Sequence, residues 1–243
     1  MEDLKKTCLH ELHKELGAKM SPFAGYDMPI EYSGIEAEHN AVRQHAGVFD
    51  VSHMGEVRIE GADATAFVNH IFTNDVNALD DGQIAYGMLT NEDGGVVDDL
   101  LVYRVSANEY FLVINAANIE KDERWILDRM DLFEGDDLSV SLESECWSEL
   151  AVQGPEAEAR LQAIFPDVDL KGIGFYRFVE LDVQGVDEEG EKIDLPMIVS
   201  RTGYTGEDGF EIYADECVIA ELWKLLLEAG VTPCGLGCRD TLR

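Results

Sequence analysis

The sequence of 243 residues holds 50 acidic residues and 18 basic ones, which gives a formal net charge of −32. The basic residues are too few to neutralise a run of phosphates, so the composition argues against nucleic acid as a partner. A hydrophobic content of 46% fits a globular fold, and no apolar run reaches the roughly 20 residues of a membrane span, so we expect a soluble, cytoplasmic protein with no membrane partner.

The first part of the chain contains signals for two helices joined by a loop. The leucines of residues 9–16 recur at helical spacing, and Gly17 follows them as a typical residue after a helix end. The stretch Met20–Ile30 has two prolines among apolar residues and predicts an irregular loop. Ser33–Glu36 has the form of a capping box, which predicts a second helix from there to Gly47.

The middle of the sequence predicts strands and two further helices. Residues 56–60 alternate between apolar and charged side chains, as in a half-buried strand. Asp63 is placed to cap a helix that carries Phe67 and Ile71, and another helix runs through Trp125. Three more strands are predicted over Gln83–Leu89, Val96–Val105 and Tyr110–Ile114.

The C-terminal part begins with an acidic, polar stretch, Gly135–Glu145, which predicts a linker or a crossing between subdomains. A strand over Leu150–Gly154 follows, with Pro155 at the first position of a helix. The remaining predicted elements are a strand, an acidic hairpin tip, its return strand and a helix, over Tyr176–Val183, Gln184–Lys192, Ile193–Ser200 and Asp215–Ala229.

Helices and strands follow one another without a regular β-α alternation. This order predicts an α+β fold with mixed, largely antiparallel sheets and flanking helices. The linker predicts two interleaved subdomains, one built from residues 1–50 with 146–243 and the other from residues 51–145.

Two adjacent carboxylates interrupt an apolar strand in the stretch Gly94–Tyr103. Successive side chains of a strand point to opposite faces, so Asp98 and Asp99 cannot both face solvent from a regular strand. Burial of an unpaired carboxylate is costly, and a buried Asp at this position therefore indicates a functional need. The alternative is a bulge or strand end at which both carboxylates are solvated.

The five cysteines of the chain show no metal-binding pattern. No pair has the C-x-x-C spacing, and no group of histidines stands near them. We therefore expect reduced, structural thiols, with neither a disulfide framework nor a metal site.

The acidic excess is spread along the chain rather than held in a tail. Such strong self-repulsion is tolerable where salt screens it, because the Debye length shrinks to roughly 3 Å at 1 M salt. This suggests a halophilic source with a saline cytoplasm. The alternative is an ordinary acidic protein.

Six short motifs stand in order along nearly the whole chain: Pro22–Tyr26, Asp50–Gly55, Gly94–Asp99, Gln153–Pro155, Arg201–Gly209 and Gly235–Arg243. Together they resemble the aminomethyltransferase family, the T protein of the glycine cleavage system. Members of that family continue into a C-terminal barrel-like domain. The resemblance therefore implies a folate-binding fold that lacks this domain, in a fragment or a truncated product.

The resemblance implies a one-carbon transfer. In this family a lipoyl arm on the H protein carries an aminomethyl group, and its transfer to tetrahydrofolate gives 5,10-methylenetetrahydrofolate, ammonia and the reduced arm. Asp99 matches the acidic residue that hydrogen-bonds the folate near N10 and orients N5, so Asp99 is the implied catalytic residue and Asp98 its outward neighbour. A carboxylate at that place can also stabilise positive charge on the methylene carbon.

The implied cofactor-binding residues begin with Glu211, which matches the family's pterin-binding glutamate, and Arg239, which matches its neighbouring arginine. A carboxylate can accept hydrogen bonds from the N–H edge of a pterin, and a guanidinium suits the carboxylates of a folate. The other matching positions are Tyr204, Tyr176, Met54 and Asn115. Taken singly, each of these residues is more common as a surface, capping, core or turn residue.

Two other functions share the same motifs. One is a related folate-dependent protein, either a demethylase of a small methylated substrate or the folate-binding part of a sarcosine-type dehydrogenase. The other is a non-enzymatic folate-binding module that assists iron–sulfur assembly. Proteins of that kind carry a Lys-Gly-Cys-Tyr-type motif, and the corresponding stretch here, Arg201–Tyr204, has Thr in place of Cys.

Overall fold

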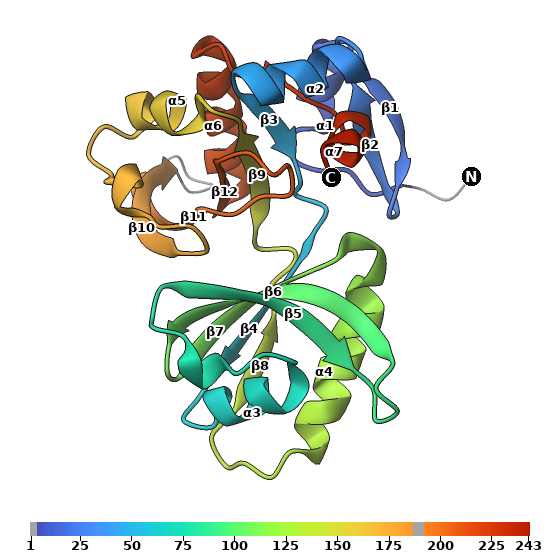
Figure 1. Ribbon diagram of the computed structural model, residues 1–243, viewed down its shortest axis with the longest axis vertical. Coiled ribbons are helices and arrows are strands. Elements are labelled where there is room, and N and C mark those ends of the chain that lie inside the picture. Colours follow the sequence, from blue (N-terminus) through green and yellow to red (C-terminus); the bar gives the residue numbers. More distant parts are fainter. Residues whose placement is uncertain (1–3, 187–191) are drawn as a thin grey trace. The chain divides into compact units, whose positions relative to one another are not determined.

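The computed structural model describes residues 4–186 and 192–243, and these residues form two compact units. Unit 1 comprises Met1–His53, Trp147–Phe175 and Val179–Arg243, and unit 2 comprises Met54–Cys146 and Tyr176–Phe178. Helices accompany mainly antiparallel sheets in both units, which confirms the predicted α+β class (Figure 1). The predicted hairpin tip lies largely outside the described residues.

Unit 1 is built on a six-stranded sheet with the order β10-β11-β12-β9-β3-β13. Its strands are β3 (Gly47–Asp50), β9 (Ser148–Gln153), β10 (Phe178–Val186), β11 (Lys192–Ser200), β12 (Gly209–Ala214) and β13 (Thr232–Pro233). Its helices are α1 (His10–Glu15), α2 (Ile35–Gln44), α5 (Ala157–Ile164), α6 (Glu216–Glu228) and α7 (Leu236–Leu242). Trp223 of α6 and Phe210 of β12 are among the buried residues of its hydrophobic core.

The predicted loop at Met20–Ile30 is wrong, because this stretch folds as an antiparallel hairpin. Strand β1 (Lys19–Phe23) pairs with β2 (Tyr26–Glu31) around a turn in which Ala24 and Gly25 have φ values of 47° and 84°. Two consecutive residues with positive φ match the twist of a tight hairpin. Prolines are tolerated because a two-stranded sheet has only edge strands.

The predicted capping box at the start of α2 is also wrong, although the helix itself is confirmed. Gly34 is the N-cap residue, with φ 109°, and no side chain caps the helix there. Instead, Glu38 in the first turn accepts backbone N–H bonds from Tyr32 at 2.6 Å and Ser33 at 2.9 Å. The carboxylate of Glu38 thus satisfies N–H groups of the residues that lead into the helix, not those of its first turn.

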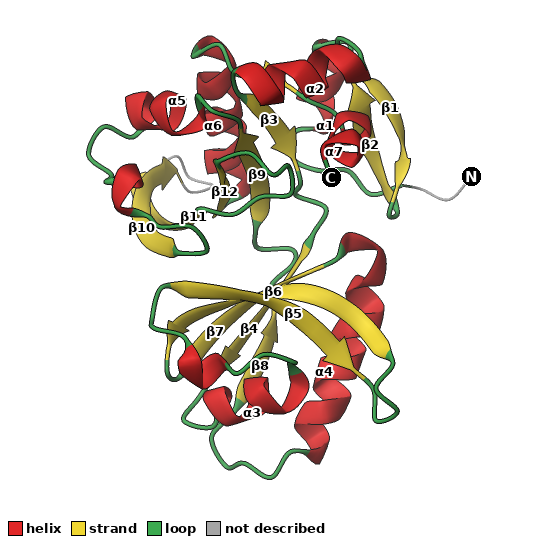
Figure 2. Ribbon diagram, in the orientation of Figure 1, coloured by secondary structure: helices red, strands yellow, loops and turns green. Residues whose placement is uncertain are grey.

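Unit 2 is a five-stranded antiparallel sheet with the order β5-β6-β7-β4-β8. Its strands are β4 (Gly55–Glu60), β5 (Gln83–Thr90), β6 (Val96–Ser106), β7 (Glu109–Ile114) and β8 (Ser139–Leu142). Helices α3 (Ala64–Ile71) and α4 (Ile119–Leu132) cover one face of this sheet (Figure 2). Phe67 and Ile126 of these helices are buried together with strand residues such as Leu112 in a second core.

The acidic stretch Gly135–Glu145 is more than a linker, because it contains β8, which pairs with β4 along the edge of the sheet. Asp63 does not cap α3 with its side chain. Its Oδ2 atom instead accepts backbone N–H bonds from Asp136 at 3.0 Å and Asp137 at 3.1 Å. Within the described ranges, no helix combines the length and apolar character needed to cross a membrane.

The charge of the chain leads to a first prediction, on stability. We expect the melting temperature to rise as potassium chloride is increased from about 0.1 M to about 2 M, because screening weakens the repulsion among the excess carboxylates. Circular dichroism would follow the unfolding. Sucrose serves as a control, because it is excluded from the protein surface but does not screen charges. A melting temperature as high at low salt as at high salt would contradict the halophilic interpretation.

Candidate functional site

The two adjacent carboxylates of β6 lie on opposite faces of the unit 2 sheet, as the strand pattern predicts. Asp98 is buried and Asp99 is half-buried. The expectation that Asp98 faces outward is therefore wrong. Asp98 lies on the same face of β6 as the buried Leu100 and Val102, which belong to the core beneath α3 and α4.

Asp99 is held by a tyrosine of the neighbouring strand. The hydroxyl of Tyr86 donates to Asp99 Oδ2 at 2.7 Å, and Asp99 stands opposite Met88 in the pairing of β5 with β6. Tyr86 is 47% exposed and Met88 is 40% exposed. An apolar, partly open surface thus surrounds a carboxylate whose direction is fixed. Tyr86 was not among the predicted site residues, although an antiparallel pairing of the two predicted strands Gln83–Leu89 and Val96–Val105 would have placed it near Asp99.

Asn115, which follows β7, joins the two aspartates. Its Nδ2 atom donates to Asp98 Oδ1 at 3.2 Å and to the backbone oxygen of Asp99 at 2.7 Å. The structure therefore brings two of the predicted site residues, Asn115 and Asp99, into direct contact.

Two other predicted site residues of unit 2, Met54 and Tyr176, are half-buried. Met54 directly precedes β4. Tyr176 has φ 57°, an uncommon conformation for a residue other than glycine, and its backbone oxygen accepts the N–H of Ile84 on β5 at 2.9 Å. The strained backbone at Tyr176 fits a position at which side-chain direction is important.

Glu211 is the centre of the predicted residues in unit 1. It lies on β12 and is buried, and Thr202 Oγ1 donates to its Oε2 atom at 2.5 Å. Burial raises the pKa of the Glu211 carboxyl, while the Thr202 hydrogen bond and the charge of Arg239 oppose the rise. The predicted pair Glu211 and Arg239 is thus electrostatically coupled. Thr202 was not among the residues predicted from the sequence.

Tyr204 and two arginines form a cationic cluster in unit 1. The guanidinium carbon of Arg239 lies 4.4 Å from the centroid of the Tyr204 ring, and that of Arg243 lies 5.3 Å from it. These are cation–π distances. Tyr204 is 41% exposed, so the group can be reached from solvent. In a chain of net charge −32, two arginines around one ring suit an anionic ligand.

A short glycine-rich loop, 201–209, presents Thr202 and Tyr204. Gln153 donates to the backbone oxygen of Thr202 at 3.0 Å and accepts the Thr205 hydroxyl at 2.8 Å. A Cβ atom on Gly203 would come within 2.1 Å of Gln153 Oε1, so a larger residue there would displace the Gln153 amide from these hydrogen bonds. The buried amide of Gln153 therefore holds this loop in place.

His53 lies close enough to Arg239 for the charge of that arginine to act on it. The His53 side chain is buried. Its ring makes an edge-to-face contact with the ring of Phe23, at a centroid distance of 5.4 Å. Burial lowers the pKa of His53 to about 4, the charge of Asp50 opposes this, and the charge of Arg239 adds to it. The imidazole is thus neutral at physiological pH, which makes it unsuitable as a general acid there.

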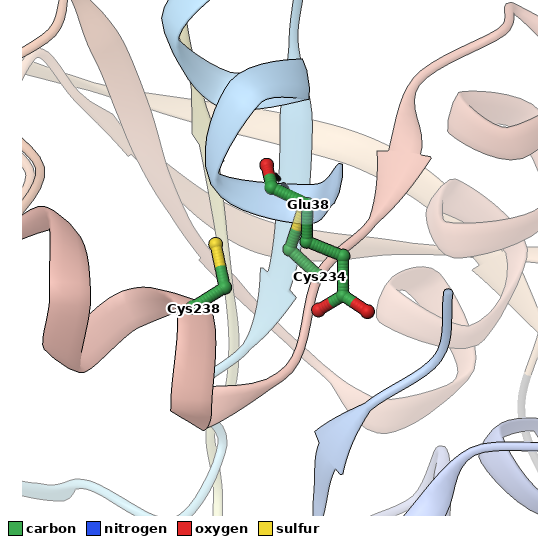
Figure 3. A group of neighbouring side chains, drawn as sticks. All are labelled: Glu38, Cys234 and Cys238. Atoms are coloured by element: carbon green, nitrogen blue, oxygen red, sulfur yellow. Dashed lines mark hydrogen bonds between the residues drawn. The ribbon is translucent and has the colours of Figure 1, made fainter. Parts of the chain in front are cut away.

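Glu38, Cys234 and Cys238 place three potential metal ligands within 4.8 Å of one another (Figure 3). The carboxylate of Glu38 also accepts the N–H of Gly34 at 3.1 Å and that of Gly235 at 2.8 Å, in addition to those of Tyr32 and Ser33. A hydrogen bond with Cys238 and burial raise the pKa of Cys234. A carboxylate occupied by four N–H donors and a Cys234 thiol held in the protonated form fit a packing role between α2 and α7.

The chain is similar to proteins of one family along its whole length. A family model, described as the GCVT N-terminal domain, matches residues 9–243. The chain is 49% identical to an aminomethyltransferase of Clostridium botulinum (strain Okra / Type B1), with coverage of 100% of this chain and 64% of that protein. It is also 49% identical to an aminomethyltransferase of Thermosipho melanesiensis, over 99% of this chain and 63% of that protein.

Solved structures give the same result. Glycine cleavage system aminomethyltransferase T from Bartonella henselae matches with a TM-score of 0.85 and 34% identity, over 99% of this chain and 62% of that one. A heterotetrameric sarcosine oxidase from Corynebacterium sp. U-96 matches with a TM-score of 0.51 and 15% identity, which shows a shared fold alone. The chain spans about 64% of the length of its curated relatives, and it belongs to the family of the GCVT N-terminal domain.

Proposed function

We propose that this chain transfers an aminomethyl group from the lipoyl arm of an H protein to tetrahydrofolate, with release of ammonia and formation of 5,10-methylenetetrahydrofolate. Membership of the family and the names of the relatives, which the chain covers to about 64%, support this proposal. The observation that carries it is the buried carboxylate of Glu211, which is coupled to an arginine stacked on an exposed tyrosine.

This group in unit 1 fits a reduced pterin by the chemistry of its donors and acceptors. Glu211, fixed by Thr202, would accept hydrogen bonds from the N–H edge of the ring. Tyr204 offers a flat apolar face, and Arg239 offers positive charge to the carboxylates of the folate. Tetrahydrofolate would supply the nucleophilic nitrogen that accepts the one-carbon unit.

In unit 2 we assign the catalytic role to Asp99. Its carboxylate, directed by Tyr86, would hydrogen-bond the folate near N10 and stabilise the positive charge that develops on the transferred carbon. We assign Asn115, Met54 and Tyr176 to the binding of the same ligand. A partly desolvated surface strengthens the effect of such a charge.

The proposed partner is the lipoylated H protein, and the proposed compartment is the cytoplasm of a halophile. The test uses an H protein loaded with an aminomethyl group. We expect ammonia release by this chain to depend on tetrahydrofolate, and we expect tetrahydrofolate to bind in anaerobic calorimetry. Absence of binding at millimolar tetrahydrofolate would contradict the proposal.

The same assay separates the related functions. Binding of tetrahydrofolate with no ammonia release, but with one-carbon transfer from a small N-methylated amine, would instead assign a demethylase. Binding with neither transfer would leave a folate-binding module. Each of these results would overturn the proposed aminomethyl transfer.

A further inference from the structure

Asp98 and Asp122 form a buried pair of carboxyl groups in unit 2. Asp122 lies in the first turns of α4 and has a fully buried side chain, and Asp98 lies on β6 beneath that helix. Asp98 Oδ1 accepts the amide groups of Asn115 at 3.2 Å and Asn118 at 3.0 Å. Among the described residues, Asp98 Oδ2 and Asp122 Oδ2 have no hydrogen-bond partner, and Asp122 Oδ1 has only an ion-pair contact with Lys121.

The two side chains lie in the same buried place, because Lys121 contacts both Asp122 Oδ1 and the backbone oxygen of Val97, the residue before Asp98. The two carboxyl groups lie within hydrogen-bonding reach of one another, a contact that two ionised groups could not maintain in a buried place. One proton between them converts this repulsion into a hydrogen bond. The same contact then satisfies oxygens that would otherwise be buried without a partner.

The charges around the pair agree with one shared proton. The ammonium of Lys121 lies 3.4 Å from Asp122 Oδ1 and also donates to the backbone oxygen of Val97 on β6. Asp98 and Lys121 are the charged groups that act on Asp122. With one proton on the pair, two carboxyl groups and one ammonium have a net charge of zero, which is the arrangement that costs least in a buried environment.

We propose that Asp98 and Asp122 share one proton, and that this carboxyl pair positions Asn115, and through it the backbone at Asp99, for the proposed reaction. Both atoms that Asn115 faces, Asp98 Oδ1 and the backbone oxygen of Asp99, accept hydrogen bonds, so only the NH2 group of its amide can point toward them. Asn115 Oδ1 is thereby turned away from the pair and offers an acceptor. The part played in the reaction rests on the proposed function, whereas the shared proton does not.

The pair should give stability a distinct pH dependence. Burial, the hydrogen bond with Asp98 and the charge of Asp98 raise the pKa of Asp122 to about 8, while Lys121 opposes the rise. Between the ordinary pKa of an aspartate and about 8, the folded state therefore holds a proton that the unfolded state has lost. Stability must then fall as pH rises through this window and level off above it.

The test compares the wild type with Asp122→Asn, which keeps the hydrogen bond but cannot lose a proton. We expect the unfolding equilibrium constant of the wild type, relative to the variant, to increase by up to about tenfold per pH unit from pH 5 to 8. The carboxyl groups of Glu56 and Glu211 also have raised pKa values. They titrate in the same way in both proteins, so their effects cancel in the ratio of the two unfolding equilibrium constants. Asp128→Asn, the same change at an exposed site of α4, should retain the wild-type dependence.

Infrared difference spectra give an independent readout. At neutral pH the spectrum of the wild type minus that of Asp122→Asn should contain the carbonyl stretch of a protonated carboxylic acid. If Asp122→Asn fails to fold, Asp98→Asn serves in its place and should lack the same band. Parallel pH curves for wild type and variant, or absence of the band, would overturn the shared proton.

The positioning role has its own test, which is the pH profile of tetrahydrofolate binding. Above about pH 8 the wild type should lose affinity as the second carboxylate forms, and Asp122→Asn should not. An identical alkaline limb in both proteins would refute the positioning role. If neither protein binds tetrahydrofolate, the proposed function fails, while the unfolding and infrared measurements still decide whether the proton is shared.

Discussion

Replacing Asp99 with Asn should slow the proposed aminomethyl transfer on the order of 100- to 1,000-fold, which is the usual loss when one group that stabilises developing charge is removed. Asn has nearly the same shape and can still accept the hydroxyl of Tyr86, so the fold and the direction of the side chain are kept. What is lost is the negative charge opposite the carbon that becomes cationic. We therefore expect the loss in kcat, with the tetrahydrofolate dissociation constant little changed.

Single-turnover ammonia release from aminomethyl-loaded H protein would measure this step, and calorimetry would measure binding. Asp93→Asn makes the same chemical change in the exposed turn between β5 and β6 and should have no effect on either quantity. Tyr86→Phe removes the hydroxyl that directs Asp99 and should give a smaller loss of rate. A fully active Asp99→Asn variant would remove Asp99 from the mechanism.

The elements that sequence reasoning predicted well are those with a strong local pattern. The helix over Asp215–Ala229 is observed as α6, because its apolar residues recur at helical spacing and its N-cap, Asp215, is the kind of residue that caps. The hairpin of β1 and β2 was expected to be a loop, since its prolines suggested irregular backbone. Its pairing depends on the turn at Ala24 and Gly25, a signal of only two residues.

Strand β8 was missed for a different reason. Its four residues lie in an acidic stretch with weak strand propensity, and they are extended because they complete the edge of a sheet beside β4. Such pairing is a tertiary effect, which no local window of sequence contains. Asp63 illustrates the same limit, since its side chain bonds backbone groups more than seventy residues away along the chain.

For the candidate site, the sequence predicted residue types but not their surroundings. Strand alternation correctly places Asp98 and Asp99 on opposite faces. Which of them is buried depends on the face that α3 and α4 cover, and the sequence does not indicate that face. The partners Tyr86 and Thr202 likewise became visible only with the pairing of the strands.

Replacing Glu211 with Gln should weaken tetrahydrofolate binding by roughly 10- to 100-fold, since a hydrogen bond to a charged group contributes about 1.5–3 kcal/mol. Gln can still accept the Thr202 hydroxyl, so the variant should fold, but its amide presents a donor where the pterin edge also presents donors. We expect this loss in the dissociation constant and in KM, with kcat for bound substrate less affected, the reverse of the Asp99→Asn result. Glu228→Gln, an exposed change in the same unit, is the matched control.

The pH dependence of tetrahydrofolate binding gives a second test of the role assigned to Glu211. Burial holds the pKa of Glu211 above the ordinary value for glutamate, and a ligand that donates hydrogen bonds prefers the ionised form. Tetrahydrofolate should therefore bind more tightly as pH rises through this pKa, and binding below it should release a proton that calorimetry in buffers of different ionisation enthalpy can count. Glu211→Gln should lose both effects. A dissociation constant that is the same in wild type and variant across this pH range would show that Glu211 does not contact the pterin, because a buried carboxylate cannot accept hydrogen bonds from a ligand without a change in its own proton affinity.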